Sequence, residues 1–362
     1  MNNILSFIPK NRQNIFVSAT KTPQVLDRVD EIVGSNSPIT MIDTFEKWKP
    51  KTNDQVSHSY MPVSWKYHFP SLYVIILKYI KRELKLTDGS GSKIIIFLPT
   101  TTAAECYGEM LANLFSPVNL LSDEGSNKKV NASINVCFLH GKLPKDTRDR
   151  VSSQFRDFSL LGGNSIIMVT TDVSARGMDY PDIGLVIQVG IPVDSSQYLH
   201  RIGRTGRAGK KGECLILISP FETKFLSAAN SYIGGPDGVR SNPEYNSKFA
   251  MTLSRALDYS YRNISNNCES PTYSSKTTQT GTNDATVSLF KELAGYMNDY
   301  VRLFEIGRSK VGTNTVHSAY TSLLNYYLPL SKSFMFQHNR AQEELSFLPK
   351  TFGIFEARTQ KK

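Results

Sequence analysis

Three arginines at every third position mark the segment of this chain that is best suited to bind phosphate. They lie in the sequence HRIGRTGR at residues 200–207, at the expected end of a helix. Arginine is permanently charged, and its planar fork matches phosphate oxygens. The two glycines let the backbone approach a ligand closely. A solvated basic helix end is the alternative, but the whole octapeptide is much more specific than any single arginine.

A second segment, TDVSARGMD at residues 171–179, follows the apolar strand expected at residues 166–169. Small residues and a glycine at a strand end allow backbone N–H groups to face a phosphate. Asp172 and Asp179 can accept hydrogen bonds from sugar hydroxyls or hold the arginines in place. As a bare loop at a strand end, the segment would be weakly informative.

His140 and Gly141 form a third candidate, directly after the strand expected at residues 134–139, and Arg148 follows on the next helix. A glycine at a strand end before a basic helix start suits a nucleic-acid phosphate. A plain glycine turn is the alternative when this pair is taken alone.

The elements that carry these segments alternate between strands and helices. Apolar runs predict strands at residues 55–63, 93–98, 134–139, 165–170, 184–190 and 212–218, and helical spacing predicts helices at residues 70–86, 101–115, 145–157 and 195–203. This rhythm predicts an α/β fold with a mainly parallel, doubly wound sheet. Ligands bind such sheets at the carboxyl ends of the strands, where we expect the distinctive residues.

The flanks of this region have a different character. Upstream we expect a short buried strand at residues 14–18, a helix at 23–34 and a linker at 44–54. A polar insertion loop is expected at 117–133. After Pro220 the pattern predicts a helical extension, with helices within 221–262 and at 286–305 and 317–330. The Ser-, Thr- and Asn-rich residues 264–285 cannot bury enough apolar surface to fold alone.

Composition narrows the function classes. The 362 residues are 40% apolar, enough for a sizeable core, and the net charge of +10 favours a polyanionic partner such as nucleic acid. The four cysteines have no CxxC spacing, which argues against a cysteine metal site and fits a reducing compartment. No apolar run approaches the roughly 18 residues of a membrane helix, and the N-terminus does not look like a signal peptide.

In their order along the chain, these segments resemble the C-terminal half of DEAD-box ATP-dependent RNA helicases. Residues 94–104 (IIIFLPTTTAA) look like motif IV of that family, residues 171–179 like motif V, and residues 200–207 like motif VI. Residues 18–20 (SAT) resemble motif III. The resemblance covers roughly residues 2–220. Among these helicases, the fungal mitochondrial RNA chaperones look most similar.

The resemblance implies a division of the chain. Residues 1–43 would be a remnant of the first RecA-like domain, 44–54 the linker, 55–220 the second RecA-like domain, and 221–362 the helical C-terminal extension. It also implies a compartment, the mitochondrial matrix, with the cytoplasm or nucleus as the alternatives. The sequence does not identify the RNA target.

The resemblance further implies a role for each matching position. Arg204 and Arg207 would be catalytic, reaching the γ-phosphate of ATP, and Asp179 would lie near its ribose. RNA-backbone contacts would come from Gly141, Arg148, Thr171 and Arg176, and interdomain coupling from Ser18, Thr20, His200 and Arg201. ATP and Mg²⁺ would be held mainly by the first RecA-like domain in cis, and we expect no metal ligand in this chain. The partner would be single-stranded or structured RNA, bound without sequence preference, and not a membrane.

Two departures from the family pattern affect the expected activity. Lys145 stands where the family usually has Gln, although a cation also suits a phosphate. The sequence contains no GxxxxGK[ST] phosphate loop and no DEAD tetrapeptide. The similar-looking GSGSK at residues 89–93 precedes a strand and lacks the Ser or Thr that would bind magnesium, so we interpret it as a turn. We therefore expect a helicase by family that is inactive as this chain alone. The alternative is a non-catalytic RNA-binding or partner-binding module.

Overall fold

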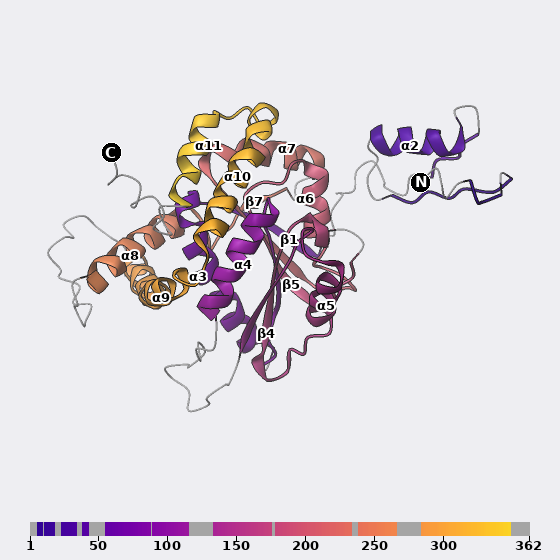
Figure 1. Cartoon of the computed structure of the whole chain (residues 1–362). Coiled ribbons are helices and arrows are strands. Elements are labelled where there is room, and N and C mark those ends of the chain that lie inside the picture. The colour runs from indigo at the N-terminus through magenta and orange to yellow at the C-terminus, as the bar shows by residue number, and fades with distance from the viewer. Residues whose placement is uncertain are drawn as a thin grey trace. The chain divides into compact units, whose positions relative to one another are not determined.

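The computed structural model describes residues 6–9, 11–18, 23–34, 38–42, 55–87, 89–115, 133–175, 178–233, 238–265 and 284–348 (Figure 1). The chain divides into two units, Met1–Lys49 and Pro50–Lys362. The division falls within the range in which the sequence predicts a linker. Most of the expected insertion loop and of the Ser/Thr/Asn-rich segment lies outside the described residues.

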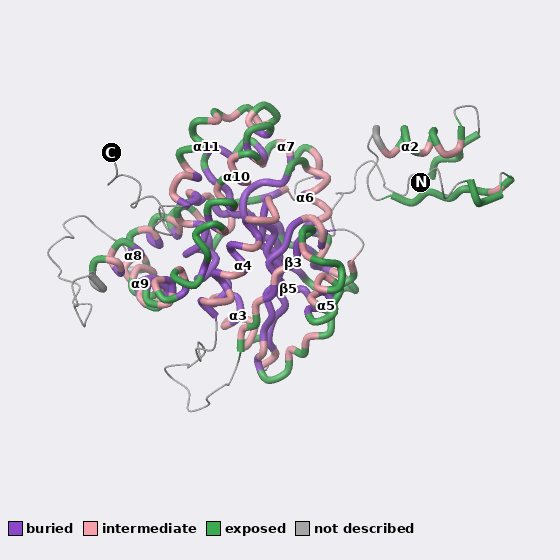
Figure 2. The backbone as a smooth tube through the Cα atoms, viewed as in Figure 1, coloured by how far each residue is buried: buried purple, intermediate pink, exposed green. Residues whose placement is uncertain are grey.

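The second unit is built on a seven-stranded sheet in which every pairing is parallel, in the order β3-β4-β2-β5-β6-β1-β7. Its central strands are buried along their whole length, which explains their continuous apolar sequences (Figure 2). The expected α/β class with a doubly wound sheet is therefore confirmed. The strands are β1 (Val56–Pro62), β2 (Lys93–Phe97), β3 (Ile134–Leu139), β4 (Ser165–Thr170), β5 (Ile183–Val189), β6 (Gly212–Ile218) and β7 (Arg240–Ser241).

Helices cover both faces of this sheet. The right-handed crossovers place α3 and α4 on one face and α5 and α6 on the other (Figure 1). Helices α8 to α11 pack on α3 and α4, so they add a layer to that face only. The helices are α3 (Trp65–Leu86), α4 (Thr101–Phe115), α5 (Lys145–Arg156), α6 (Ser195–Ile202), α7 (Lys224–Ile233), α8 (Ser247–Ser265), α9 (Asp284–Arg308), α10 (Thr313–Ser333) and α11 (His338–Leu345).

Helix α3 begins five residues earlier than the sequence predicts, and it encloses Pro70. A proline is normally tolerated only in the first turn of a helix, and Pro70 lies in the second turn of α3. The observed start is stabilised from a distance. The Glu344 carboxylate of α11 accepts hydrogen bonds from Ser64 Oγ at 2.6 Å and from the Trp65 amide at 3.0 Å. A carboxylate at this position satisfies otherwise unpaired amides of the first turn.

The helices after residue 220 pack on the sheet domain. Tyr326 of α10 donates a hydrogen bond to the Ile191 carbonyl at 2.9 Å, just beyond the carboxyl end of β5. Ser322 of α10 bonds Thr100 at the start of α4, with 2.7 Å between the hydroxyl oxygens. These contacts tie the extension to the loops that follow the carboxyl ends of β5 and β2.

A buried glutamate forms the centre of the same junction. The Glu222 carboxylate accepts hydrogen bonds from the Ser219 amide at 2.7 Å, from the Ile191 amide at 3.1 Å and from the Tyr327 hydroxyl of α10. Gly190 beside it has φ +73°, and a Cβ there would stand 2.3 Å from Tyr327 Oη. Burial raises the pKa of Glu222 to about 7, against the opposing effect of its three hydrogen-bond donors.

We expect Glu222 to make the stability of this chain depend on pH. Its folded-state pKa of about 7 lies above the ordinary value of 4.5, so the folded chain holds the proton more tightly. The contribution of Glu222 to the unfolding free energy therefore falls as pH rises from about 4.5 to about 7. Urea denaturation across this range, followed by Trp65 fluorescence in a Trp48→Phe background, measures it. Glu222→Gln does not titrate and should lose this component. An identical pH profile for both proteins would show that Glu222 is not the source.

The first unit contains one described helix, α2 (Pro23–Val33), as the sequence predicts. The expected buried strand at residues 14–18 is wrong. Ile15 and Val17 are 79% and 93% exposed, and the segment is not a strand. The described residues of this unit contain no strand with which it could pair. A short apolar run predicts burial only where a partner strand satisfies its backbone.

Candidate functional site

The segments that begin at His140 and Thr171 meet at the carboxyl ends of the strands because β3 and β4 are neighbours in the sheet. Leu139 lies opposite Thr170 in the register, and the Thr170 hydroxyl donates to the Leu139 carbonyl at 2.7 Å. Gly141 is the second residue after β3, and Thr171 is the first residue after β4. The two residues therefore lie side by side. A Cβ at Gly141 would meet nothing within 4 Å, so packing inside the chain does not explain this glycine. It leaves room for a ligand to approach the backbone.

Cationic donors stand beside this edge at the start of α5. Arg148 lies in the first turns of α5, and its Nε is buried without a hydrogen-bond partner in the described part of the chain. Lys145 is exposed at the first position of the helix. Together with Gly141 and Thr171 they form what we call the α5 edge, which can bind a phosphate backbone. Arg176, also predicted for this group, lies outside the described residues.

His140 packs beneath the α5 edge. It is 3% exposed, its ring stacks parallel to Phe138 with centroids 6.3 Å apart, and neither ring nitrogen has a hydrogen-bond partner among the described residues. Burial lowers its pKa, so it is neutral at pH 7.

The first arginine of the triplet is buried inside the domain. Arg201 is fully buried, and its guanidinium makes a bidentate pair with Asp172, with Nε–Oδ1 at 2.7 Å and Nη2–Oδ2 at 3.1 Å. It also lies over the Phe97 ring and donates to Gln188 at 3.4 Å. Burial opposes its charge, but attraction to Asp172 raises its pKa above the ordinary value. Arg201 therefore links the 200–207 segment to the 171–179 segment.

The role of Arg201 in interdomain coupling, together with Ser18, Thr20 and His200, stays a prediction. Ser18 belongs to the first unit, whose position relative to the second is not determined, and Thr20 lies outside the described residues. His200 is half-buried at the end of α6.

The other two arginines gather at the opposite edge of the sheet. Thr205 donates to the Ile183 carbonyl at 2.5 Å, at the amino end of β5, and this fixes the turn that carries Arg204 and Arg207. Arg204 donates to the Met178 carbonyl, and Arg207 pairs with the Asp179 carboxylate at 2.5 Å. We call Asp179, Arg204 and Arg207 the arginine cluster.

The expectation that all distinctive residues share the carboxyl edge is therefore wrong for this cluster. The loop after β4 crosses from the carboxyl ends of the strands to their amino ends, where β5 begins. Helix α6 makes the same crossing between β5 and β6. The last residues of both segments therefore lie at the amino ends of the strands. One domain therefore presents two separate sets of candidate ligand-binding groups.

Electrostatics suit the arginine cluster to an anion. Burial and the neighbouring Arg207 lower the pKa of Arg204 to about 10, which still leaves it charged at pH 7. Arg204 Nε is buried without a hydrogen-bond partner among the described residues. The Asp179 side chain is 87% exposed, so its pair with Arg207 is solvated and worth only about 0–1 kcal/mol. An incoming phosphate can replace Asp179 at small cost.

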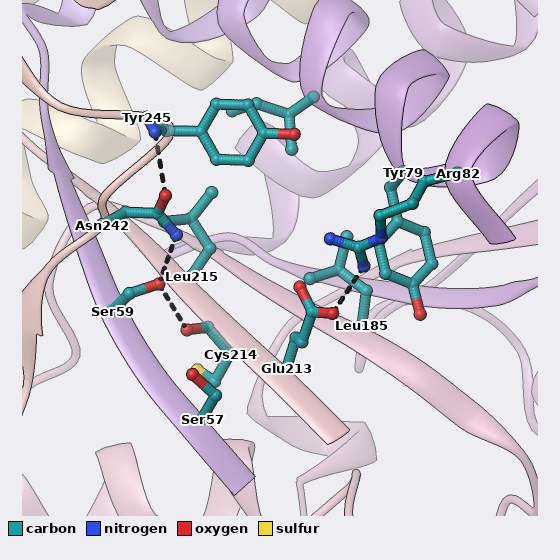
Figure 3. Close-up of a pocket in the computed structure, with 11 residues that line it drawn as sticks. Ser57, Ser59, Tyr79, Arg82, Leu185, Glu213, Cys214, Leu215, Asn242 and Tyr245 are labelled. Atoms are coloured by element: carbon teal, nitrogen blue, oxygen red, sulfur yellow. Dashed lines mark hydrogen bonds and ion pairs between the residues drawn. The ribbon is translucent and has the colours of Figure 1, made fainter. Parts of the chain in front are cut away.

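A pocket in another part of the domain contains none of these residues. It lies between α3, β1 and β6 and is lined by Arg82, Glu213 and Asn242, among others (Figure 3). Asn242 donates to Ser59 Oγ at 2.8 Å and accepts from the Tyr245 amide at 2.8 Å, which holds the approach to α8 against β1. Arg82 and Glu213 pair with each other between α3 and β6, so these polar groups of the pocket already have partners within the fold.

Two classes of site are not found in the described part of the chain. No group of three or more His, Cys, Asp or Glu side chains there could hold a metal ion. No described helix is both long and apolar enough to cross a membrane. The GSGSK segment at residues 89–93 begins in a turn at Gly89 and ends on the first residue of β2, Lys93, whose Nζ donates to the Arg156 carbonyl at 2.6 Å.

Comparisons with known proteins agree with this arrangement. Residues 76–209 match the model of the helicase conserved C-terminal domain. DEAD-box ATP-dependent RNA helicase 25 of Arabidopsis thaliana is 38% identical over 227 residues, which are 62% of this chain and 34% of that protein. DEAD-box ATP-dependent RNA helicase 26 of Oryza sativa subsp. japonica is 35% identical over 225 residues, which are 62% of this chain and 36% of that protein. The chain thus spans about a third of the length of these relatives.

The fold comparison extends over more of the chain. The solved structure of the DEAD-box helicase Mss116 bound to ssRNA and UDP-BeF matches with a TM-score of 0.58 at 20% identity, covering 95% of this chain and 53% of that one. At this identity the likeness shows the fold alone, including the helices that follow the sheet. The expected resemblance to the C-terminal half of DEAD-box RNA helicases is confirmed by these comparisons, and the fold is that of a RecA-like helicase C-terminal domain followed by helices.

Proposed function

We propose that this chain works as the second RecA-like half of an ATP-dependent RNA helicase. The observation that carries the proposal is the presence of two distinct sets of groups on one domain. The α5 edge offers Gly141, Thr171 and cations to an RNA backbone, and the arginine cluster offers Arg204 and Arg207 to phosphates. DEAD-box helicase names among the relatives, and the ssRNA bound to Mss116 in its solved structure, support the choice of RNA and ATP.

In this proposal the chain supplies charge to ATP that another RecA-like domain holds. Arg204 and Arg207 fit the phosphates, and Asp179, once released from Arg207, fits a ribose hydroxyl. Arg207 would stabilise the negative charge that builds up on the transferred phosphoryl group. Mg²⁺ would be held by the other domain, as the resemblance implies.

RNA contact would be made through phosphate and sugar, and hence nearly without sequence preference. An RNA-chaperone role in the mitochondrial matrix is part of the proposal and rests on sequence likeness alone. A non-catalytic RNA-binding module is the second candidate, because this chain has no phosphate loop of its own.

We expect the chain to bind single-stranded RNA weakly, with strong salt dependence. Fluorescence anisotropy with labelled oligouridylate and with a mixed-sequence RNA of equal length, between about 50 and 200 mM salt, measures this. The logarithm of affinity should fall linearly with the logarithm of salt, and the two RNAs should bind about equally. Arg148→Ala should weaken binding to both and reduce the salt slope by about one.

Arg150→Ala is the matched control, because Arg150 is an exposed residue of the same helix that points about 200° away from Arg148. It should change the affinity less than Arg148→Ala does. A strong preference for one sequence that is insensitive to salt would contradict backbone recognition.

A further inference from the structure

One face of α5 connects the two sets of groups. Ser152, Phe155 and Arg156 lie four, seven and eight positions beyond Arg148 along the helix, so the four residues share a stripe. Arg148 belongs to the α5 edge. The other three residues contact the segment Met178–Tyr180, which contains Asp179. The stripe from Arg148 to Arg156 is roughly 12 Å long at the rise of an α-helix.

The contact at the far end of α5 has a buried centre, with one exposed hydrogen bond beside it. Ser152 Oγ lies 3.1 Å from the Tyr180 hydroxyl, and the Phe155 and Tyr180 rings pack edge to face with centroids 5.2 Å apart. All three residues are at most 4% exposed. Arg156 Nε donates to the Asp179 carbonyl at 3.3 Å. Close-packed contacts of this kind transmit displacement because they leave no empty space to absorb it.

The segment Met178–Tyr180 is also held by two arginines of the 200–207 segment. Arg204 donates to the Met178 carbonyl, and Arg207 pairs with the Asp179 carboxylate. The segment therefore contacts both α5 and these two arginines. Lys93 Nζ bonds the Arg156 carbonyl at 2.6 Å, which anchors the last turn of α5 to the start of β2.

We propose that α5 couples RNA contact to nucleotide contact within this domain, and that Arg156 is the positioning residue that ties its far end to Asp179. This inference rests on the proposed function, because it takes RNA as the ligand of the α5 edge. Arg156 acts through the main chain of Asp179. Its terminal guanidinium nitrogens make no hydrogen bond or ion pair with any residue that the structure describes.

The test is hydrogen–deuterium exchange of this chain with and without saturating oligouridylate. In the wild type, RNA should slow exchange of the amides in residues 178–183 by roughly threefold or more, because a ligand that binds one end of a coupled unit stabilises the other. Arg156→Ala should lose more than half of that slowing and keep its RNA affinity within about twofold, since Arg156 is not on the α5 edge. Arg156→Lys, which can still donate to the carbonyl, should restore part of it.

Arg150→Ala is again the control, with the same loss of charge on the same helix, and it should keep the full effect. Equal slowing in wild type and Arg156→Ala overturns the role of Arg156. RNA binding without any slowing at residues 178–183 overturns the coupling and leaves the proposed function intact. Absence of RNA binding by the wild type overturns the proposed function itself.

Discussion

Arg207→Ala should lower kcat for RNA-stimulated ATP hydrolysis by about 10³-fold once the chain is joined to a first RecA-like domain. In the proposed function Arg207 acts on the transition state, so removing it raises the barrier for the chemical step. The KM for ATP should change far less, because the other domain holds the adenine and the remaining phosphates. Steady-state kinetics at saturating RNA measures both constants.

The solvated pair between Arg207 and Asp179 does not prevent this role. Asp179 is 87% exposed, so exchanging it for a phosphate costs little. Arg207→Lys should recover only part of kcat, since a point charge lacks the planar fork. Arg340→Ala, an exposed change on α11, is the control and should leave both constants unchanged. A raised KM with an intact kcat would make Arg207 a binding residue and would refute its assignment as the finger.

Arg201→Ala should destabilise the domain by roughly 3 kcal/mol. Arg201 is fully buried, and its removal leaves Asp172 without a cation and Gln188 without its donor. We place the value at the low end for a broken buried pair because the Asp172 side chain is 32% exposed and water screens its charge. Urea denaturation followed by Trp65 fluorescence, in the Trp48→Phe background, measures the loss.

Lys210→Ala provides the matched control for Arg201. It also breaks a pair with an aspartate, Asp182, but both side chains are well exposed, at 65% and 42%. The expected loss is below about 1 kcal/mol. If the two variants lose equal stability, the buried pair between Arg201 and Asp172 does not stabilise the domain as described.

Much of the fold was predictable because its sheet is buried on both faces. Runs such as KIIIF in β2 and SIIMVT in β4 have no polar interruption, so their limits are visible in the sequence. The start of α3 was not predictable. It depends on Glu344, which is 280 residues from Ser64, and no local pattern reveals that contact.

The candidate site was predictable in its residues but not in its grouping. Residue types and spacing identified Arg204, Arg207 and Asp179, and the structure brings these three together. The sequence did not reveal that Arg201, three residues before Arg204, is buried. The burial of Arg201 depends on contacts with Asp172, Gln188 and Phe97, which lie on or just after three different strands. Arg156 carried no signal beyond being one more basic residue in a helix, since its partner is a main-chain carbonyl.

ATP hydrolysis by the separated and joined halves tests the central claim most directly. The account predicts no measurable RNA-stimulated hydrolysis by this chain alone, because its sequence lacks the lysine and magnesium ligand of a phosphate loop. Joined to a first RecA-like domain, the same chain should hydrolyse ATP in an RNA-dependent reaction that requires Arg207. Robust hydrolysis by this chain alone, lost in Arg207→Ala, would contradict the claim that it supplies only one half of the ATP site.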